Sequence, residues 1–404
     1  MPIIESLLDT DTYKFFMMKV VWKKFPTAHV KFKFKCRNDG IDFRPFIDRI
    51  NEEIDNLCKL RFKKDELDYL KSMKSRYGTY LFNDGFIDFL RTFNLERKHI
   101  NVSVDETGEM HIYIEGPWLQ AILFEVPVLA IVNEVYFSQH GEVEEIFRPG
   151  SSLKTVGPKG HYYVEEMICQ LESEPDFMFS EFGTRRRYSR EWQEYVLRRI
   201  NEIVPGSLAG TSNVYFAWKL GLTPIGTMAH EFLQAGQALA PSLRESVTYM
   251  LDAWLDVYRG DLGIALTDVI SSKVFFDDFD LLYSKVFDGV RHDSGDPINY
   301  GYMAINHYKK FGIDPRTKTV VFSDGLTIRS AIDLFHKFRN EIGVGFGIGT
   351  SITNNVGIDA LQIVIKMVEC NYFPVAKISD TPSKGMCEDP QFVKKLKHVY
   401  GLDT

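Results

Sequence analysis

The second half of the chain alternates between short apolar segments and segments with a helical pattern, and this alternation limits the possible folds most strongly. From about residue 175, each apolar segment ends in Gly, Ser, Thr or Asp. One unit has a strand within residues 317–325, then a helix with Ile328, Ile332 and Phe335 at i, i+4 and i+7, and a second strand at residues 343–349. Repeated units of this kind predict a parallel sheet that is either open or closed into a barrel.

An earlier unit shows the same pattern. It has a strand near Gly289–Val290, a helix with Ile298, Tyr302 and Ile305 on one face, and a turn at Gly312. In open parallel sheets and in α/β barrels alike, the active site lies at the carboxyl ends of the strands. The polar residues that follow these strands are therefore the candidates for function.

The first part of the chain has a mixed pattern. Residues 30–36 alternate between apolar and basic side chains, which predicts a half-buried strand, and residues 109–115 predict another. Residues 45–60 and 64–73 have helical patterns, and the stretch at 141–160, rich in Gly, Pro, Ser and Lys, predicts a loop. An α+β domain is thus expected before the repeated units.

Composition limits the partners. The net charge of −7 argues against nucleic acid, so an anionic ligand would need local positive charge. The run Arg185–Arg187 offers such charge, although by itself it favours a solvated surface patch. Five scattered cysteines and an acidic N-terminal segment indicate a reduced, cytoplasmic protein without an export signal. Polar residues interrupt the apolar stretch 118–137, so we expect a buried element and no membrane partner.

Four polar clusters follow predicted strands, and each precedes a predicted helix. Helix N-termini offer unpaired N–H groups, and glycine allows an anion to approach the backbone. The glycines at 345–349 therefore predict a phosphate site, although their order matches neither a dinucleotide-binding fingerprint nor a P-loop. The clusters are residues 210–213, 226–231, 291–297 and 345–351.

Charged residues in these clusters suggest metal and phosphate chemistry, with helix capping as the alternative. Asp293 could bind Mg²⁺ or sugar hydroxyls, and Arg291 could bind a phosphate, while the same Asp-Ser pair before a proline also suits a helix cap. Asp268 alone favours a cap. His230 follows a strand expected at residues 224–229, and this position favours a functional role.

Taken in order, these clusters resemble the nicotinate phosphoribosyltransferases, closest to the bacterial and fungal type of similar length. The resemblance runs almost end to end. One such motif would be weak evidence, but this many in the family's order are highly specific. The motifs are residues 8–14, 34–38, 181–186, 210–214, 226–231, 267–268, 291–297, 323–325 and 377–380.

The resemblance implies a type II phosphoribosyltransferase fold, in which an N-terminal α+β domain packs on an irregular α/β barrel. On this chain it places the N-terminal domain at residues 1–125, the catalytic barrel at 126–365 and a C-terminal segment that returns to the first domain at 366–404. It implies ATP-coupled transfer of 5-phosphoribosyl from phosphoribosyl pyrophosphate to nicotinate, for NAD biosynthesis. It also implies Mg²⁺ and a phosphohistidine at the position of His230.

The resemblance also assigns a nicotinate site. In the related nicotinamide phosphoribosyltransferases, residues matching Tyr13 and Phe182 sandwich the pyridine ring, and the residue matching Arg185 contacts its polar substituent. The position of Ser212 holds an aspartate there, and serine removes a charge that would repel nicotinate. The relatives' tyrosine comes from a neighbouring subunit, so a homodimer is one alternative for this chain and a monomer is the other.

The reaction needs positioning and charge stabilisation more than proton transfer, because the pyridine nitrogen already carries a lone pair. We assign Arg291 to the phosphates, Asp293 to ribose hydroxyls or Mg²⁺, and Asp268 to the neighbourhood of Mg²⁺. The 5-phosphate is assigned to two loops that contain Ser323, Asp324, Gly325, Gly347, Gly349 and Thr350.

Three competing functions are a nicotinamide phosphoribosyltransferase, a quinolinate phosphoribosyltransferase and a non-catalytic sensor of phosphoribosyl pyrophosphate or nicotinate. Ser212 argues against the first. The motifs around Tyr13 and His230 argue against the second, which does not use ATP. A sensor could have lost its reactive residues, yet Asp268, His230, Arg291 and Asp293 are all present.

Overall fold

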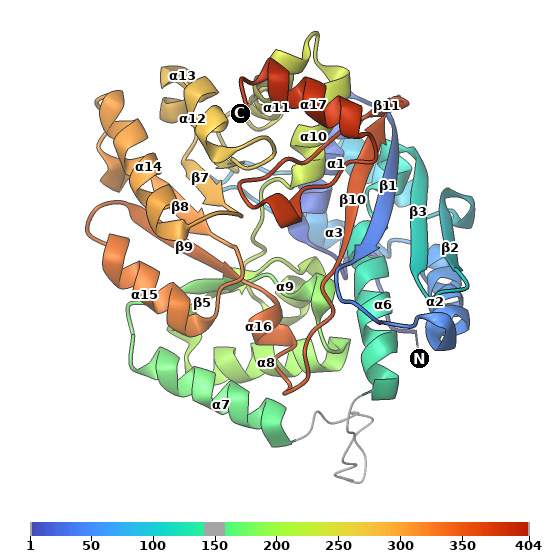
Figure 1. The fold of residues 1–404 in the computed structure, drawn as a ribbon. Helices are drawn as coiled ribbons and strands as arrows, with labels where there is room; N and C mark the ends of the chain where they lie inside the picture. The colour runs from blue at the N-terminus through green and yellow to red at the C-terminus, as the bar shows by residue number, and fades with distance from the viewer. Residues whose placement is uncertain (1, 141–157, 403–404) are drawn as a thin grey trace.

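The computed structural model describes residues 2–140 and 158–402 (Figure 1). The predicted loop at 141–160 therefore lies mostly outside the described residues. Its last three residues are helical and not a loop, because they begin α7 (Pro158–Glu172). Proline suits the first turn of a helix, where its missing N–H leaves no hydrogen bond unmade.

A six-stranded parallel sheet forms the larger part of the molecule, as the alternating pattern predicts. Its paired strands all run parallel, and Figure 1 shows helices along the outside of this sheet. In sheet order the strands are β5 (Leu208–Thr211), β4 (Phe179–Glu181), β9 (Gly343–Ile348), β8 (Thr319–Phe322), β7 (Gly289–His292) and β6 (Ile264–Leu266).

An extended segment without regular pairing bridges the end strands β5 and β6. The strand predicted at residues 224–229 is wrong, since only Pro224 forms an isolated bridge, to Thr211. Proline donates no hydrogen bond to a ladder, which limits pairing here. On the other side, the Thr227 hydroxyl donates to the carbonyl of Ile264 in β6 at 2.9 Å. The sheet thereby curves into an irregular α/β barrel.

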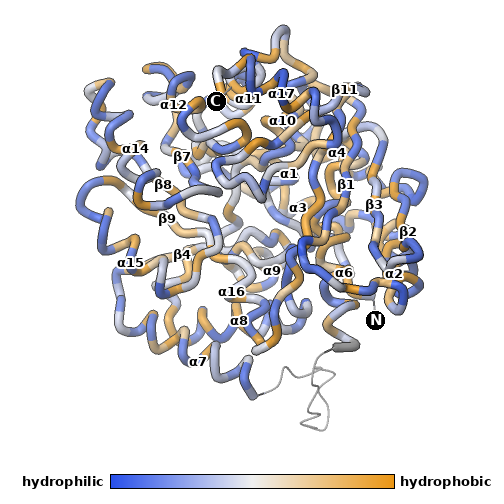
Figure 2. Tube along the Cα trace, in the orientation of Figure 1, coloured by the Kyte–Doolittle hydropathy of each residue, from blue (hydrophilic) through white to orange (hydrophobic). Residues whose placement is uncertain are grey.

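Helix α14 (Pro297–Lys310) buries only Ile305 of the three residues in the predicted stripe. Ile298 and Tyr302 are 40% and 38% exposed, whereas Tyr300 and Tyr308 are buried. The two buried aromatic rings pack together with Ile305, and burial of these large apolar side chains stabilises this orientation of the helix. Figure 2 shows hydrophilic and hydrophobic residues alternating along the outer helices α7, α14 and α15, which is typical of helices with one solvated face.

A five-stranded antiparallel sheet forms the second layer of the molecule. The C-terminal strand β10 pairs with the N-terminal strand β1, so the chain returns to its first domain (Figure 1). The predicted divisions fall at the start of α6 and inside β10, and they stay predictions. In sheet order the strands are β11 (Phe373–Pro374), β10 (Ile363–Cys370), β1 (His29–Cys36), β3 (Met110–Pro117) and β2 (Ile100–Val104).

The predicted apolar stretch is a core helix. Residues Trp118–Ser138 are long and apolar enough to cross a membrane by composition, yet 83% of the most apolar window is buried inside the molecule. Helix α6 (Glu125–His140) packs against α2 and β10 and also contacts the turn at Thr184–Arg186 in the barrel. It therefore joins the two layers.

The remaining helices surround these two sheets. Those of the N-terminal part are α1 (Thr12–Lys24), α2 (Ile47–Lys59), α3 (Lys64–Ser72), α4 (Asp84–Thr92) and α5 (Trp118–Ala121). Those that follow are α8 (Arg190–Ile203), α9 (Val214–Leu220), α10 (His230–Leu239), α11 (Ser246–Tyr258), α12 (Ser272–Asp278), α13 (Leu281–Val286), α15 (Ile328–Phe338), α16 (Thr350–Thr353) and α17 (Pro390–Val399).

Candidate active site

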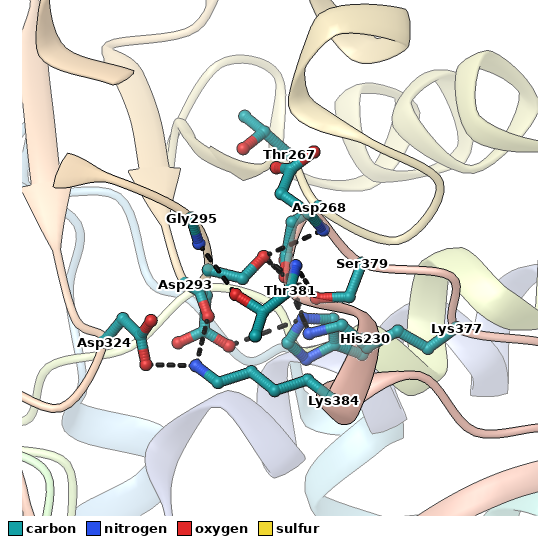
Figure 3. Close-up of polar contacts among 12 residues, drawn as sticks. His230, Thr267, Asp268, Asp293, Gly295, Asp324, Lys377, Ser379, Thr381 and Lys384 are labelled. Atoms are coloured by element: carbon teal, nitrogen blue, oxygen red, sulfur yellow. Dashed lines mark hydrogen bonds and ion pairs between the residues drawn. The ribbon is translucent and has the colours of Figure 1, made fainter. Parts of the chain in front are cut away.

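Four side chains from distant segments meet beside the carboxyl ends of β6 and β7 (Figure 3). His230 begins α10, Asp268 follows β6 and Asp293 follows β7. Lys377 comes from the C-terminal segment. The His230 Nε2 atom lies 2.8 Å from Asp268 Oδ1 and 3.4 Å from Asp293 Oδ2. It also lies 2.7 Å from Lys377 Nζ. Three residues that the sequence suggested separately thus form one cluster.

Asp268 is completely buried, and its carboxylate is surrounded by donors. Its Oδ2 atom lies 2.7 Å from Lys377 Nζ and accepts hydrogen bonds from Ser294 at 2.6 Å and from Ser379 at 3.3 Å. Although burial opposes ionisation, His230 and Lys377 hold the pKa of Asp268 well below its usual range. The cap interpretation of Asp268 is wrong, because the N-cap of α12 is the side chain of another residue, Ser271. Asp268 instead positions His230 and Lys377.

Asp293 lies at the partly exposed edge of this cluster, and although burial opposes the shift, Arg291 is close enough to help lower the pKa of its carboxyl group. Asp293 Oδ1 accepts from the Ser323 hydroxyl at 3.0 Å, and its side chain is 28% exposed. The cap interpretation of the Asp-Ser pair is also wrong, because Asp296 caps α14 through the N–H of Asn299. The Nε of Arg291 is buried without a hydrogen-bond partner among the described residues. Because an unpaired buried N–H is destabilising, we expect a bound anion to complete it.

The His230 imidazole is uncharged at neutral pH, as a nucleophile must be. Burial, together with the adjacent Lys377 ammonium, lowers the pKa of His230 to about 4, although Asp268 opposes this shift. The imidazole is therefore neutral at neutral pH. When Nε2 donates to Asp268, the lone pair lies on Nδ1, and Nδ1 can attack an electrophile.

Basic side chains at the antiparallel sheet also lie near this cluster. Local sequence patterns gave them no role in the site. Arg37 follows β1, and its buried Nε has no hydrogen-bond partner in the described part of the chain. Burial, with help from Lys377 and Arg37, lowers the pKa of Lys366 in β10 to about 7. Burial also lowers the pKa of Arg186 to about 10, and the charges of Arg185 and Arg37 act in the same direction. Because cations that repel one another are stabilised by a polyanion, this arrangement favours a polyphosphate ligand.

The four residues assigned to nicotinate belong to one region of the same chain. Tyr13 lies in α1, Phe182 follows β4 and Ser212 follows β5. The backbone of Tyr13 packs tightly against the extended segment between β5 and β6, because a Cβ added to Gly226 in that segment would lie 3.0 Å from the Tyr13 backbone nitrogen. Tyr13 is also the neighbour that raises the pKa of Arg185 most. Tyr13 therefore lies beside the Arg185 of its own chain.

A carboxyl group, that of Asp11, lies directly beside Ser212. Its hydroxyl donates to Asp11 Oδ1 at 2.7 Å, and Arg185 Nε lies 3.9 Å from the other carboxylate oxygen of Asp11. The expectation that serine simply removes a repelling carboxylate is therefore incomplete, because a neighbouring residue supplies one.

The basic run Arg185–Arg187 divides into separate roles. Arg187 is completely buried and binds both carboxylate oxygens of Asp9, at 2.7 and 2.9 Å. The interpretation of this run as a solvated patch is wrong for Arg187, whose charge is used inside the molecule. Arg186 donates to the carbonyl of Ile363 at 3.0 Å and to Gln362 Oε1 at 3.1 Å, whereas Arg185 lies between the carboxylates of Asp11 and Glu125.

The two loops assigned to the 5-phosphate lie side by side. The Ser351 hydroxyl donates to the carbonyl of Leu326 at 2.5 Å, which joins the segment after β9 to the segment after β8. Asp324 forms an ion pair with Lys384, so its charge is balanced. Thr350 begins α16 directly after Gly349. The phosphate role of these loops stays a prediction.

Gly347, a predicted 5-phosphate residue, lies in β9 and packs against the ring of Phe182. A Cβ at Gly347 would lie 2.3 Å from two atoms of the Phe182 ring, so Gly347→Ala should displace that ring from its place. We expect KM for nicotinate to rise at least tenfold, with a smaller change in KM for phosphoribosyl pyrophosphate. Steady-state kinetics with each substrate varied in turn measures both, and Gly345→Ala, whose Cβ would meet only Val321 at 3.4 Å, is the control. Equal effects of the two substitutions on KM for nicotinate would contradict the assignment of Phe182 to the nicotinate site.

Comparisons with known proteins identify the family. The family model "Nicotinate phosphoribosyltransferase (NAPRTase) family" matches residues 177–404, and its N-terminal domain model matches residues 8–133. A nicotinate phosphoribosyltransferase of Cupriavidus necator is 49% identical over 404 residues, which cover 99% of each chain. One of Xanthomonas axonopodis is 48% identical over 403 residues, which cover 99% of this chain and 98% of the relative.

Solved structures agree with this result. The crystal structure of the Vibrio cholerae nicotinate phosphoribosyltransferase superposes with a TM-score of 0.89 at 36% identity, covering 100% of this chain and 94% of that one. The Porphyromonas gingivalis enzyme superposes with a TM-score of 0.89 at 32% identity, covering 99% and 100%. The fold, the clustered site residues and these similarities together establish that the chain belongs to the nicotinate phosphoribosyltransferase family.

Proposed function

We propose that this enzyme transfers 5-phosphoribosyl from phosphoribosyl pyrophosphate to nicotinate, and that ATP drives the reaction through a phosphohistidine at His230. Membership of the family supports the transfer reaction and its place in NAD biosynthesis. The single observation that supports the ATP step is the neutral His230 imidazole, held by Asp268 and Lys377 in a region where the Nε atoms of Arg37 and Arg291 have no hydrogen-bond partner among the described residues.

In the ATP step, the free nitrogen of His230 attacks the γ-phosphorus of ATP. The bond between the γ-phosphorus and the bridging oxygen breaks, and ADP leaves with that oxygen. Lys377 Nζ lies 2.7 Å from His230 Nε2, the nitrogen that also faces Asp268, so we assign Lys377 to holding the imidazole in place while the other ring nitrogen reacts. Water later hydrolyses the phosphohistidine. This hydrolysis can drive synthesis only if the two forms of the enzyme bind substrates and products with different affinities.

In the glycosyl step, the nicotinate nitrogen forms a bond to C1 of the ribose while pyrophosphate departs with the bonding electrons. No base is needed, so the site supplies orientation and charge stabilisation. We assign Arg291, Arg37 and Lys366 to neutralising the pyrophosphate, because the Nε atoms of the two arginines have no hydrogen-bond partner among the described residues. Asp293, with a partly exposed carboxylate, is placed to bind ribose hydroxyls.

The donor set fits Mg²⁺ at Asp293 but not at Asp268. Mg²⁺ prefers oxygen ligands, keeps several waters and binds one or two carboxylates together with substrate phosphates. Both Asp268 oxygens already contact His230, Lys377 or a serine hydroxyl, so direct ligation there would break the clamp on His230. Asp293 is partly exposed and could take this role. A bound Mg²⁺ would neutralise charge on the phosphate oxygens.

The choice of nicotinate over nicotinamide can be tested at Ser212. Ser212→Asp would place a second carboxylate against Asp11 and near the acid group of nicotinate. We expect kcat/KM for nicotinate to fall at least tenfold, which corresponds to about 1.4 kcal/mol, while kcat/KM for nicotinamide is spared or improved. Ser212→Ala controls for the loss of the hydroxyl alone. The assignment fails if Ser212→Asp leaves the ratio of the two kcat/KM values unchanged.

A further inference from the structure

The Asp11 side chain does not cap the helix that it precedes. Asp11 is the N-cap residue of α1, where an aspartate normally accepts hydrogen bonds from the first turn of the helix. Its side chain makes no such bond. Instead it is 2% exposed and accepts the Ser212 hydroxyl at 2.7 Å. The Tyr13 hydroxyl also lies beside it. The carboxyl group is therefore turned towards the proposed nicotinate site.

The charges around Asp11 do not balance once nicotinate binds. Arg185 lies 3.9 Å from Asp11 and 3.6 Å from Glu125. Glu125 has a closer cation, because Lys14 Nζ lies 2.5 Å from its carboxylate. Asp11 has no cation of its own at such a distance among the described residues. Bound nicotinate would bring a third carboxylate to the Arg185 guanidinium, beside those of Asp11 and Glu125. Because like charges in one buried site repel one another, protonation of one carboxylate becomes favourable.

The Ser212 hydroxyl has only one proton to donate. While Asp11 is ionised, Ser212 donates this proton to Asp11, so Ser212 can only accept from a ligand. That arrangement suits an amide N–H. Once Asp11 is protonated, its own O–H can donate to Ser212, and the Ser212 proton becomes free to donate to the carboxylate of nicotinate. The protonation state of Asp11 thus decides which ligand Ser212 recognises.

We propose that Asp11 is a specificity-determining residue, which takes up a proton when nicotinate binds and thereby turns Ser212 from an acceptor into a donor. The inference rests on the proposed nicotinate site. It adds a residue and a proton to the recognition step.

The surroundings of Asp11 favour this uptake. Burial raises its pKa above the usual range, although Arg185 and the Ser212 and Tyr13 hydroxyls oppose the shift. Glu125 raises it further, and Glu181, whose own pKa burial raises to about 7, also interacts with Asp11. In contrast, Lys14 keeps the pKa of Glu125 lowered despite its burial. The charged and titratable groups that face Asp11 are therefore Arg185, Tyr13, Glu125 and Glu181.

Titration calorimetry of nicotinate binding in buffers of different ionisation enthalpy counts the protons taken up. For the wild-type protein at about pH 8, we expect uptake that approaches one proton, and an apparent Kd for nicotinate that rises up to about tenfold per pH unit. In Asp11→Asn, the amide N–H₂ donates permanently to Ser212. Uptake should then fall close to zero, and the Kd should change little with pH.

Glu125→Gln is the matched control, because it removes the other carboxylate beside Arg185. We expect this variant to retain the proton uptake. The proposal is overturned if the wild-type protein takes up no proton, if Asp11→Asn takes up as much as the wild type, or if Glu125→Gln alone abolishes the uptake. The absence of proton uptake in the wild-type protein overturns the proposal even if a variant does not fold.

Nicotinamide provides the second arm of the test. Because it is neutral and donates an N–H, its binding should involve no proton uptake, and the preference for nicotinate over nicotinamide should decrease as pH rises in the wild type only. Product formation is measured on the same preparations. An absence of nicotinate mononucleotide would overturn the proposed function, whereas product formation without proton uptake would overturn only the role of Asp11.

Discussion

Replacement of His230 by asparagine should abolish the stimulation of the reaction by ATP and the incorporation of acid-labile label from γ-³²P ATP. Asparagine has no nitrogen lone pair that can accept a phosphoryl group. Slow formation of nicotinate mononucleotide without ATP should survive, because His230 takes no part in the glycosyl step. The measurements are label counting after gentle precipitation and product assays with and without ATP.

His336→Asn is the matched control for this experiment. His336 lies on α15 at the protein surface, where its ring pairs with Glu174 at 2.9 Å, so its replacement should leave the label and the ATP effect unchanged. The phosphohistidine assignment fails if His230→Asn still incorporates label or keeps its full stimulation by ATP.

Replacement of Arg291 by alanine should have the second largest effect. Arg291 lies in β7, and its buried Nε has no protein partner in the described residues, so the substitution removes charge-assisted hydrogen bonds to a phosphate oxygen. Such bonds contribute roughly 1.5–3 kcal/mol each, and we expect kcat/KM for phosphoribosyl pyrophosphate to fall about 10- to 100-fold. Asp293→Asn should reduce the same parameter through the ribose or Mg²⁺.

The control for Arg291→Ala is Arg329→Ala, because the Arg329 side chain is 78% exposed on α15. Thermal unfolding of all three variants checks that the fold is retained. Near-normal kinetics in both Arg291→Ala and Asp293→Asn would show that this cluster does not bind the sugar phosphate.

Local patterns predicted most of the strands and helices, and their failures have physical causes. Strands β1, β7, β8 and β9 lie where apolar alternation or short apolar runs placed them. The segment at 224–229 is apolar enough for a strand, but Pro224 and the close approach of Tyr13 to Gly226 leave it without regular pairing. On α14 the sequence offers two apolar stripes, and only three-dimensional packing selects the one with Tyr300.

The candidate site was predictable only where its residues follow strands of the barrel. His230, Asp268 and Asp293 could be found in this way. Arg37 was part of a recognised motif, but it follows a strand of the other sheet, and Lys366 is a single basic residue in an apolar strand of that sheet, so local pattern placed neither at the site. Lys377 was part of a recognised motif, but only the fold shows that it contacts His230. The buried Asp11 was hidden by its position before a helix, which suggests an N-cap.

The central claim, ATP-coupled transfer to nicotinate, is tested most directly by competition among substrates. Purified protein is supplied with phosphoribosyl pyrophosphate, ATP, Mg²⁺ and equal concentrations of nicotinate, nicotinamide and quinolinate, and the nucleotides are separated and quantified. We predict that nicotinate mononucleotide dominates the products and that ADP forms together with it. Nicotinamide mononucleotide formed as efficiently, product formed from quinolinate with release of carbon dioxide, or ligand binding without any product would contradict the account.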